Sequence, residues 1–389
     1  MSNKYTAAII GCGSIGNAHM DGYNLNDNVE VVAVADPLLV AREEYMEKYN
    51  IPQGYPTVEE MLEKAKPDIV SVCTWHPLHP APTIAAAQAG VKAVICEKPM
   101  ATSLGAANSM VDACEANGTK LIISHQRRFT PGWEKAHELI RQKAIGDPVL
   151  VNCKIVQGLL NCGTHAIDGS RFVLGDPQAL WVMGAVERDT DRYERDTPIE
   201  DSCMALVQME GGLQLFIQSD LCMEGAAAGG FHIRGTEGML DVSEAGVKLF
   251  NADSDGWEQV PLRVEAEEIR PIGGQTNAAQ VRELIAWIEG GPEHRGTGKK
   301  ARATVEIMMA LYESARQHRV IQLPLQEEGH PLELMVDEGK LPVEKPGRYD
   351  IRGFLKRDAI DEKAYAELKN QGMGHHQVMK ILSEKEQKE

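Results

Sequence analysis

The chain has 389 residues, enough to bury more than one hydrophobic core, and its 43% hydrophobic and 25% charged residues are typical of a folded globular protein. These values argue against a disordered chain and against a single small domain. The 57 acidic residues outnumber the 40 basic ones, and the formal net charge of −17 opposes binding to nucleic acid and to anionic membranes.

The first residues lead into an apolar segment without the basic region, long apolar stretch and cleavage site of a signal peptide. No apolar run approaches the roughly 20 residues that span a bilayer. The eight cysteines form no C-x-x-C pair, so neither a zinc site nor a redox motif is indicated. We therefore expect a cytoplasmic protein with reduced thiols, no metal, no membrane association and no nucleic-acid partner.

Short apolar runs alternate with helical patterns from residue 5 to about residue 124. This strand–helix–strand repeat predicts an α/β domain over residues 1–125, with a parallel sheet and right-handed crossovers. The expected strands are Ala7–Gly11, Val29–Ala35, Ile69–Cys73, Ala93–Cys96 and Leu121–Ser124, and the expected helices span about 15–25, 39–49, 57–65, 80–90 and 103–118.

The sequence pattern changes after a predicted helix at about 131–144. Extended segments separated by glycine-rich or charged turns predict a mainly antiparallel sheet, with one helix at about 163–174. Two period-3.6 patterns near the end predict helices that pack back on the first domain. The expected extended segments are 148–156, 178–187, 202–209, 213–219, 230–243 and 246–250, and the expected late helices are Gln275–Glu289 and Ala301–Gln317. These elements define a predicted second domain over residues 126–325. A polar extension follows over 326–389, with a charged helical tail at 359–386.

A G-x-G-x-x-G motif follows the first predicted strand and opens the first predicted helix. Gly11 allows the tight turn, Gly13 lets backbone N–H groups approach a pyrophosphate, and Gly16 lets the helix lie close to the strand. A glycine-rich turn without a ligand is the alternative, but the position between strand and helix favours a dinucleotide. The residues of this motif that we expect to bind the cofactor are Gly11, Gly13, Ser14, Ile15 and Gly16.

Asp36 ends the second predicted strand, twenty residues after Gly16. Its carboxylate would accept hydrogen bonds from the adenosine ribose hydroxyls and repel a 2′-phosphate. Pro37 and Leu38 offer no side-chain donor to a phosphate, whereas Arg42 lies further along the helix. NAD is therefore the expected cofactor, and NADP is the less favoured one.

Lys98, in the run Cys96-Glu97-Lys98-Pro99, follows a later strand at the sheet edge where ligands of open α/β sheets gather. In the functional interpretation its ammonium binds the reacting hydroxyl, stabilises developing alkoxide charge and helps to relay the proton. The alternative is a solvated charge at the end of a strand, paired with Glu97.

A set of motifs together carries a resemblance to a known family. These are the glycine fingerprint, Asp36, Cys73-Thr74-Trp75-His76-Pro77-Leu78-His79, Glu97-Lys98-Pro99, Gln126-Arg127-Arg128-Phe129 and Gly163-Thr164-His165-Ala166-Ile167-Asp168. In this order they resemble the glucose–fructose oxidoreductase / inositol dehydrogenase / rhizopine catabolism (Gfo/Idh/MocA) family, over roughly residues 5–320. The resemblance implies a Rossmann dinucleotide-binding domain, an α+β domain with an open, mainly antiparallel sheet, and a homo-oligomer, a dimer or a tetramer, formed through the outer face of that sheet.

In that family the lysine of Glu-Lys-Pro and a histidine of a second-domain helix do the chemistry, often with an aspartate four residues before the histidine. The resemblance gives these roles to Lys98, His165 and Asn161. Asn161 departs from the pattern, because an amide can orient a substrate hydroxyl but cannot hold a proton or a negative charge. His165 is then the main candidate base, with a near-neutral pKa suited to reversible proton transfer. A structural histidine with satisfied hydrogen bonds is the alternative.

A second departure is the short connection, about ten residues, between the strand ending near Ile155 and Gly163. Many relatives carry a longer loop over the substrate here. The pocket is then either more open, or completed by the C-terminal extension or a neighbouring subunit. A bulkier substrate such as a glycoside would fit that opening.

Other residues carry weaker expectations, most with a structural alternative. Thr74, His76, His79 and Glu97 are expected beside the cofactor and Trp75 beside the substrate. For Trp75, His76 and His79, packing and helix capping are equally good explanations. Arg127 and Arg128 reach either substrate hydroxyls or an interdomain ion pair. Asp168 either orients His165 or stabilises the helix, and the latter is favoured. His375 and His376, in the charged tail, are expected to be solvated.

The sequence thus predicts an NAD-dependent oxidoreductase that transfers a hydride between nicotinamide and a hydroxyl-bearing carbon of a sugar, inositol or glycoside, with Lys98 and His165 as catalytic residues. One alternative is an enzyme that recycles its NAD, as an epimerase or a glycoside-cleaving enzyme acting through a transient keto-sugar. Another is a non-catalytic sensor whose dinucleotide site regulates a protein partner. Retention of Lys98 and His165 argues against the sensor, and the replaced aspartate at position 161 leaves it open.

Overall fold

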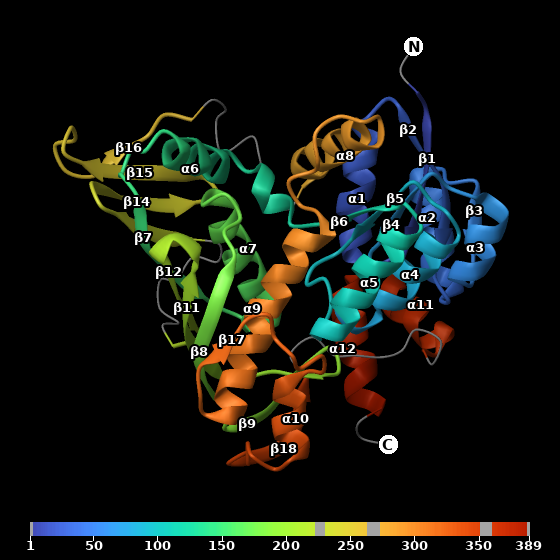
Figure 1. Cartoon of the computed structure of the whole chain (residues 1–389). Coiled ribbons are helices and arrows are strands. Elements are labelled where there is room, and N and C mark those ends of the chain that lie inside the picture. Colours follow the sequence, from blue (N-terminus) through green and yellow to red (C-terminus); the bar gives the residue numbers. More distant parts are fainter. Residues whose placement is uncertain (1–2, 222–229, 263–272, 351–359, 387–389) are drawn as a thin grey trace.

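The computed structural model describes residues 3–221, 230–262, 273–350 and 360–386 (Figure 1). Within them, six parallel strands form the first sheet, in the order β3-β2-β1-β4-β5-β6. Its strands are β1 (Tyr5–Ile10), β2 (Val29–Ala35), β3 (Gln53–Tyr55), β4 (Ile69–Val72), β5 (Ala93–Cys96) and β6 (Lys120–Ile123), and its helices are α1 (Ser14–Asn24), α2 (Leu39–Tyr49), α3 (Val58–Ala65), α4 (Pro80–Gln88) and α5 (Leu104–Ala116).

Alternate residues of β1 explain why helices cover both faces of this sheet. Ala7 and Ile9 belong to a buried cluster with residues of α1 and α2, whereas Ala8 and Ile10 belong to a cluster with residues of α3, α4 and α5. β4 and β5 are buried at every position, as expected for parallel strands between two helical layers. Sequence analysis missed only the edge strand β3 of this sheet, because its three residues form no apolar run.

Nine strands of the described residues form the second sheet, in the order β16-β15-β14-β13-β7-β12-β11-β8-β17. Its neighbouring strands are antiparallel except β7 and β12, which are parallel. Its strands are β7 (Pro148–Ile155), β8 (Ala179–Glu187), β11 (Ser202–Met209), β12 (Gln214–Ser219), β13 (Phe231–Gly235), β14 (Gly238–Ser243), β15 (Gly246–Asn251), β16 (Glu258–Gln259) and β17 (Ile321–Gln322). The predicted fold class, a parallel α/β sheet followed by an α+β part with a mainly antiparallel sheet, is confirmed.

One face of the second sheet packs against helices α6 (Pro131–Arg141), α7 (Thr164–Val173) and α9 (Gly298–Gln317). The other face is open, because buried and more exposed residues alternate along β11, as at Ala205 and Met204. The single extended segment expected at 230–243 is in fact two strands, β13 and β14, which pair antiparallel.

Two helices that lie between β16 and β17 in the chain pack back on helices of the first sheet (Figure 1). α8 (Gly274–Ile288) lies against α1, and a Cβ added to Gly22 would lie 2.5 Å from the Cβ of Asn277, so this close approach requires glycine. α9 contacts α5 on one side and β8 on the other, where a Cβ on Gly184 would lie 2.9 Å from atoms of Leu311. α9 therefore connects the two sheets, whereas α8 is anchored to the first sheet's side.

The C-terminal extension contributes more structure than its polar sequence predicts. It forms α10 (Pro331–Asp337), β18 (Lys345–Asp350), α11 (Glu362–Asn370) and α12 (His375–Glu386). The tail is therefore two helices rather than one, and Gly372 between them has a φ of +81°. β18 pairs with β9 (Thr190–Glu194), which also pairs with β10 (Thr197–Pro198), to form a small third sheet.

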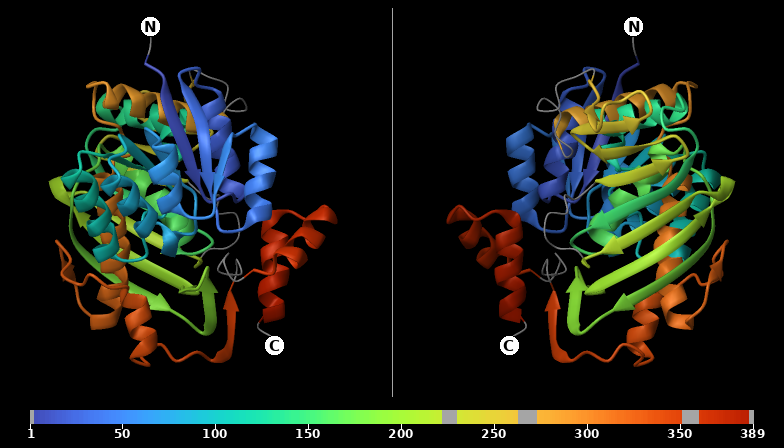
Figure 2. Two further views of the ribbon diagram at one scale, coloured as in Figure 1. Left: turned by 90° about the vertical axis from the view of Figure 1, so that its right-hand side faces the viewer. Right: turned by 90° about the vertical axis from the view of Figure 1, so that its left-hand side faces the viewer.

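The two tail helices lie beside the first sheet, and α11 contacts α2 (Figure 2). Tyr365, Val378 and Met379 belong to the same buried cluster as Leu38 and Tyr45, so the contact is apolar. Among the described helices, none is both long enough and apolar enough to cross a membrane.

Candidate active site

A cleft of about 820 Å³ opens at the carboxyl ends of the parallel strands. Its walls come from the turn after β1, the end of β2, the loops after β4, β5 and β6, and from segments of the second and third sheets and the tail. The lining residues on which the argument rests are Gly11, Gly13, Ser14, Ile15, Asp36, Pro37, Thr74, Trp75, Glu97, Lys98, Gln126, Asn161, Arg195 and His375. Ligands of open α/β sheets bind at this edge.

The glycine-rich turn has the geometry that a dinucleotide requires. Gly11 has a φ of +96°, and a Cβ there would lie 2.9 Å from the backbone carbonyl of Cys73, so only glycine fits. A Cβ on Gly16 would lie 2.8 Å from the Tyr45 hydroxyl and 3.1 Å from the Gly11 carbonyl oxygen. Gly13 precedes α1 without a side-chain cap, so the backbone N–H groups of the first turn point toward the space where a pyrophosphate would bind.

Asp36 lies at the other side of this turn and is 2% exposed. Its carboxylate accepts N–H groups from Cys12 at 2.8 Å and from Leu38 at 3.0 Å. Arg42 donates to the carbonyl oxygens of Asp36 and Pro37. These hydrogen bonds hold the backbone of the β2–α2 turn in place. They also fix the Asp36 carboxylate, which we expect to contact the ribose hydroxyls.

Lys98 reaches across the cleft from the loop after β5 to the second sheet's side. Its Nζ donates to the main-chain oxygen of Asn161 at 3.1 Å and lies 3.4 Å from Asn161 Oδ1. Burial lowers the pKa of the ammonium below its usual value, although the negative charge of Glu97 opposes this effect. Lys98 therefore forms a contact between the two sides of the cleft. It is not a solvated charge at the end of a strand.

Glu97 is held by a buried chain of hydrogen bonds that sequence analysis missed. One carboxylate oxygen lies 3.0 Å from Nε2 of His19, whose Nδ1 lies 3.0 Å from the Ser71 hydroxyl, which in turn lies 2.7 Å from the Tyr23 hydroxyl. The other carboxylate oxygen accepts the N–H of Lys98 at 3.2 Å. This chain connects α1 and β4 to the backbone of the candidate catalytic lysine.

Asn161 and His165 stand on an irregular helical segment. A π-helical turn, Leu159–Gly163, carries Asn161 and runs directly into α7, where His165 is the second residue. Buried carboxylates fix its start, because the N–H of Leu159 donates to Glu200 at 2.7 Å. π-helical turns are rare and occur frequently at functional sites.

His165 differs from the expectation of a near-neutral pKa. The residue is 1% exposed and lies behind Asn161 rather than among the residues that line the cleft, and burial together with the positive charges of Lys98 and Arg127 holds its pKa well below the usual value. Within the described residues, neither ring nitrogen has a hydrogen-bond partner. The imidazole is therefore neutral at physiological pH and unsatisfied, which contradicts the alternative of a structural histidine with satisfied hydrogen bonds.

His125, which sequence analysis did not single out, lies beside His165 with 5.8 Å between ring centroids. Its Nε2 lies 3.0 Å from the Thr164 hydroxyl, and its Nδ1 lies 3.3 Å from a carboxylate oxygen of Asp168. Burial lowers the pKa of His125 to about 4. The only signal in the sequence is its position directly after the end of β6.

Asp168 binds an arginine rather than His165. Arg128 is fully buried, and its guanidinium donates twice to Asp168, at 2.7 Å each, and also contacts Asp176 at 2.9 Å. Arg127 pairs with Glu244 at 2.6 Å and does not line the cleft. Both arginines therefore form ion pairs rather than lining the cleft, but their partners lie in the same predicted domain, 126–325, so the pairs are not the interdomain pairs that were expected as the alternative. Asp168 is an ion-pair partner in the core.

The expected residues after β4 divide into two groups. Thr74 and Trp75 line the cleft, whereas His79 is buried between the carbonyl oxygens of Pro99 and Thr74, at 2.9 and 3.0 Å, and holds two loops together. His76 is buried, and burial and the charge of Arg195 keep its pKa well below the usual value. The structure therefore brings Thr74 and Trp75 to the cleft and leaves His76 and His79 behind its wall.

Arg195 lines the cleft beside these residues and was not expected from the sequence. It forms the tip of the β9–β10 hairpin, with its guanidinium 6.0 Å from the Trp75 ring centroid and 3.5 Å from His76 Nδ1. Asp350 of β18 accepts the backbone N–H groups of Arg195 and Asp196, at 3.0 and 2.9 Å. The C-terminal extension therefore helps to complete this wall, as one of the alternatives for the short loop foresaw.

Unsatisfied polar atoms gather at the cleft. Within the described part of the chain, no hydrogen-bond partner exists for Thr74 Oγ1, for either side-chain atom of Gln126, or for Asn161 Nδ2. Buried polar atoms are nearly always paired, so a cluster of exceptions indicates that a polar ligand completes it. The cleft therefore fits a dinucleotide in its glycine-rich half and a hydroxyl-rich molecule in the other.

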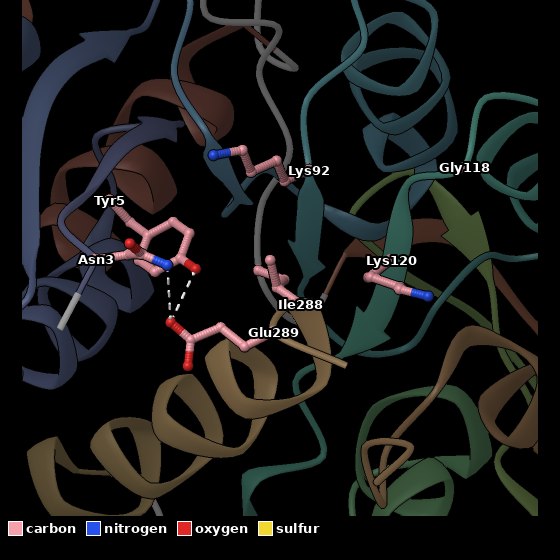
Figure 3. A pocket seen from close by; sticks show the side chains of 7 residues that line it. All are labelled: Asn3, Tyr5, Lys92, Gly118, Lys120, Ile288 and Glu289. Atoms are coloured by element: carbon pink, nitrogen blue, oxygen red, sulfur yellow. Dashed lines mark hydrogen bonds between the residues drawn. The ribbon is translucent and has the colours of Figure 1, made fainter. Parts of the chain in front are cut away.

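A second hollow lies at the opposite, amino-terminal edge of the first sheet (Figure 3). There Tyr5 and Asn3 donate to the Glu289 carboxylate at 3.2 and 3.4 Å, and Lys92 pairs with Asp68 at 2.8 Å. The glycine-rich turn and Lys98 line the cleft and not this hollow, so the hollow lies apart from the candidate site.

The fold and the cleft together define a dinucleotide-binding oxidoreductase, with a parallel sheet, a glycine-rich turn and a nearby lysine. A mainly antiparallel sheet forms its second part. The NAD-binding Rossmann fold of the oxidoreductase family GFO_IDH_MocA matches residues 5–125, and the GFO/IDH/MocA C-terminal domain matches residues 156–241. The chain belongs to the Gfo/Idh/MocA family of NAD-binding oxidoreductases. The predicted family and the predicted cofactor, NAD, are confirmed.

Similar proteins extend over most of the chain. A D-apiose dehydrogenase from Paraburkholderia graminis is 26% identical over 355 residues, which are 82% of this chain and 90% of the relative. A D-glucoside 3-dehydrogenase from Escherichia coli is 25% identical over 361 residues, which are 83% of this chain and 98% of the relative. A levoglucosan dehydrogenase solved with NADH and levoglucosan shares the fold, with a TM-score of 0.72 at 20% identity, over 83% of this chain and all of that one.

Proposed function

We propose that the protein is an NAD-dependent dehydrogenase that oxidises a CH–OH group of a sugar, inositol or glycoside. The observation that carries this proposal is the contact between Lys98 Nζ and Asn161 next to an unsatisfied, neutral His165. The relatives that act on D-apiose and D-glucosides support the substrate class. In this proposal residues 1–125 bind NAD, residues 126–325 provide most of the substrate pocket, and residues 326–389 complete it.

The nicotinamide of bound NAD would accept the hydride. The Lys98 ammonium has three N–H donors, and its contacts with Asn161 leave one for the oxygen of the reacting hydroxyl. That positive charge stabilises the alkoxide as it develops. His165 accepts the hydroxyl proton, because its ring is neutral and has a nitrogen lone pair without a partner.

Asn161 acts in this proposal as a positioning residue. Its main-chain and side-chain oxygens hold the ammonium of Lys98, and its Nδ2 has no partner within the described residues. An amide orients a hydroxyl without taking its proton. The proton therefore passes to His165, and the buried Asp168–His125 pair lies directly behind that ring.

The function is tested by mixing the purified protein with NAD and a panel of D-apiose, methyl glucosides, levoglucosan and inositols, and following NADH at 340 nm. Formation of NADH and of a keto product supports the dehydrogenase. Conversion without net NADH, with cofactor that co-purifies, supports the NAD-recycling enzyme instead. If NAD binds but no member of the panel is converted, the proposal is overturned and the sensor gains support.

The pH dependence of kcat/KM follows from the two shifted pKa values. His165 must be neutral, and its pKa lies below the usual 6.5, so we expect no loss of activity as the pH falls from 8 through 6.5. Lys98 must be protonated, and its pKa is lowered from 10.5, so activity should fall on the alkaline side earlier than for an ordinary lysine. Steady-state kinetics from about pH 6 to above pH 10 check both limbs, and an acid limb at or above 6.5 would contradict His165 as the buried base.

The open face of the second sheet is the surface through which we propose that copies of the chain associate. Met183, Leu206 and Phe216 are cross-strand neighbours on this face, and Met183 is 50% exposed. Met183→Glu would place a charge in an apolar interface, so we expect dissociation to the mass of one chain in light scattering after gel filtration. Leu25→Glu, at an exposed apolar residue that follows α1 and lies away from the second sheet, is the control. A wild-type protein that is already monomeric contradicts this proposal.

A further inference from the structure

We infer that Glu362, on the first tail helix, is a second carboxylate that makes the protein select NAD over NADP. The two cofactors differ only by the 2′-phosphate on the adenosine ribose, which a carboxylate at the end of the second Rossmann strand repels. Here that carboxylate is Asp36. The inference rests on the NAD binding of the proposed function but not on the oxidation of a sugar, so failure to oxidise any sugar would leave it standing.

The turn between β2 and α2 is where a 2′-phosphate would need hydrogen-bond donors. A helix N-terminus normally offers unsatisfied backbone N–H groups to a phosphate. In this chain the N–H of Leu38 donates to Asp36 at 3.0 Å, and the N–H of Leu39, the first residue of α2, donates to Glu362 at 3.0 Å. Two donors that a phosphate would use are therefore already bound by carboxylates.

Glu362 is held at this turn by the packing of the tail. It is in the first turn of α11, next to the cap residue Asp361, and Lys369 further along α11 pairs with Glu44 of α2 at 3.1 Å. Tyr365 joins the buried cluster that contains Leu38. The carboxylate therefore comes from a helix fixed to α2 at several points (Figure 2).

The tail also borders the cleft itself at this end. His375, the first residue of α12, lines the same cleft as Asp36 and Pro37, and its Nδ1 lies 3.0 Å from the Tyr365 hydroxyl. Arg42 is the cation nearest the turn in sequence, and it donates to the carbonyl oxygens of Asp36 and Pro37. Among the residues that the structure describes at this turn, the Asp36 and Glu362 carboxylates outweigh the Arg42 guanidinium, so these groups together repel a dianionic 2′-phosphate.

The test measures binding of NADH and NADPH by cofactor fluorescence, and it needs no substrate. Glu362→Gln keeps an oxygen that can accept the N–H of Leu39 but removes the charge. We expect the Kd for NADPH to fall about three- to ten-fold, with the Kd for NADH unchanged within about two-fold. Because the carboxylate is exposed, the gain should shrink in high salt.

Glu367→Gln is the matched control, since it removes the same charge from an exposed position on the same helix. It should leave both Kd values unchanged. Glu362→Ala removes the hydrogen-bond acceptor as well as the charge. A further rise in the Kd values of both NADH and NADPH in this variant would indicate that α11 no longer packs correctly on α2, an effect separate from the loss of charge. The inference is overturned if the wild-type protein binds NADPH as tightly as NADH, if it binds neither, or if Glu362→Gln leaves the NADPH affinity unchanged.

Discussion

Replacement of Lys98 by methionine is expected to lower kcat/KM for the oxidised substrate about a thousand-fold. The change removes the ammonium that contacts Asn161 across the cleft and that would stabilise the alkoxide, and loss of one preorganised donor to a developing oxyanion costs factors of this order. Methionine preserves much of the side-chain volume, so the cleft should stay intact. Steady-state rates of NADH formation measure the effect.

Lys92→Met is the matched control for this experiment, because Lys92 lies at the opposite edge of the sheet and pairs with Asp68 (Figure 3). It should retain nearly full activity. NADH binding should survive in both variants, since the glycine-rich turn and Asp36 are untouched. If the Lys98 variant keeps more than about a tenth of the wild-type kcat/KM, the lysine is not the group that carries the alkoxide charge.

Replacement of Arg128 by methionine should destabilise the fold by about 4 kcal/mol, within the range found when one partner of a buried ion pair is removed. The guanidinium is 0% exposed and joins Asp168, Asp176 and the main-chain oxygen of Arg295. Its loss leaves the buried carboxylate of Asp168 without its strongest partner. Urea unfolding followed by circular dichroism gives the change in free energy of unfolding.

Arg295→Met provides the comparison, because Arg295 pairs with Glu134 and Glu283 while its side chain is 28% exposed. Partly exposed pairs contribute little, so a change below about 1 kcal/mol is expected there. A double variant, Arg128→Met with Asp168→Leu, should recover part of the loss because it removes the unpaired charge as well. Equal, small effects for Arg128 and Arg295 would show that the buried cluster does not stabilise the fold.

The repeating parallel sheet was predictable because each strand is a short apolar run followed by an amphipathic or capped helix. β2 and β5 begin and end where their apolar runs do. β9, β10 and β18 were not predictable, since they are short or polar, and β18 pairs with a hairpin more than 150 residues earlier in the chain. Pairings of that kind depend on tertiary contacts that local patterns do not contain.

The candidate site shows the same division. The glycine motif, Asp36 and Lys98 follow strand ends, and parallel strands bring such positions to one edge, so their convergence could be foreseen. His19, Arg195 and Glu362 could not, because each depends on the packing of a distant segment. The pKa of His165 was also misjudged, since burial beside two cations is a property of the folded site and not of the residue type.

The hydrogen-bonded chain from Tyr23 through Ser71 and His19 to Glu97 makes one rigid support of the phosphate-binding helix and the lysine loop. Substitutions that retune this support would disturb cofactor docking and turnover together. Asn161 and Arg195, on the opposite wall of the cleft, are not members of this hydrogen-bonded chain. An engineer who wants a new substrate from this scaffold should therefore diversify that wall and leave the nucleotide side unchanged.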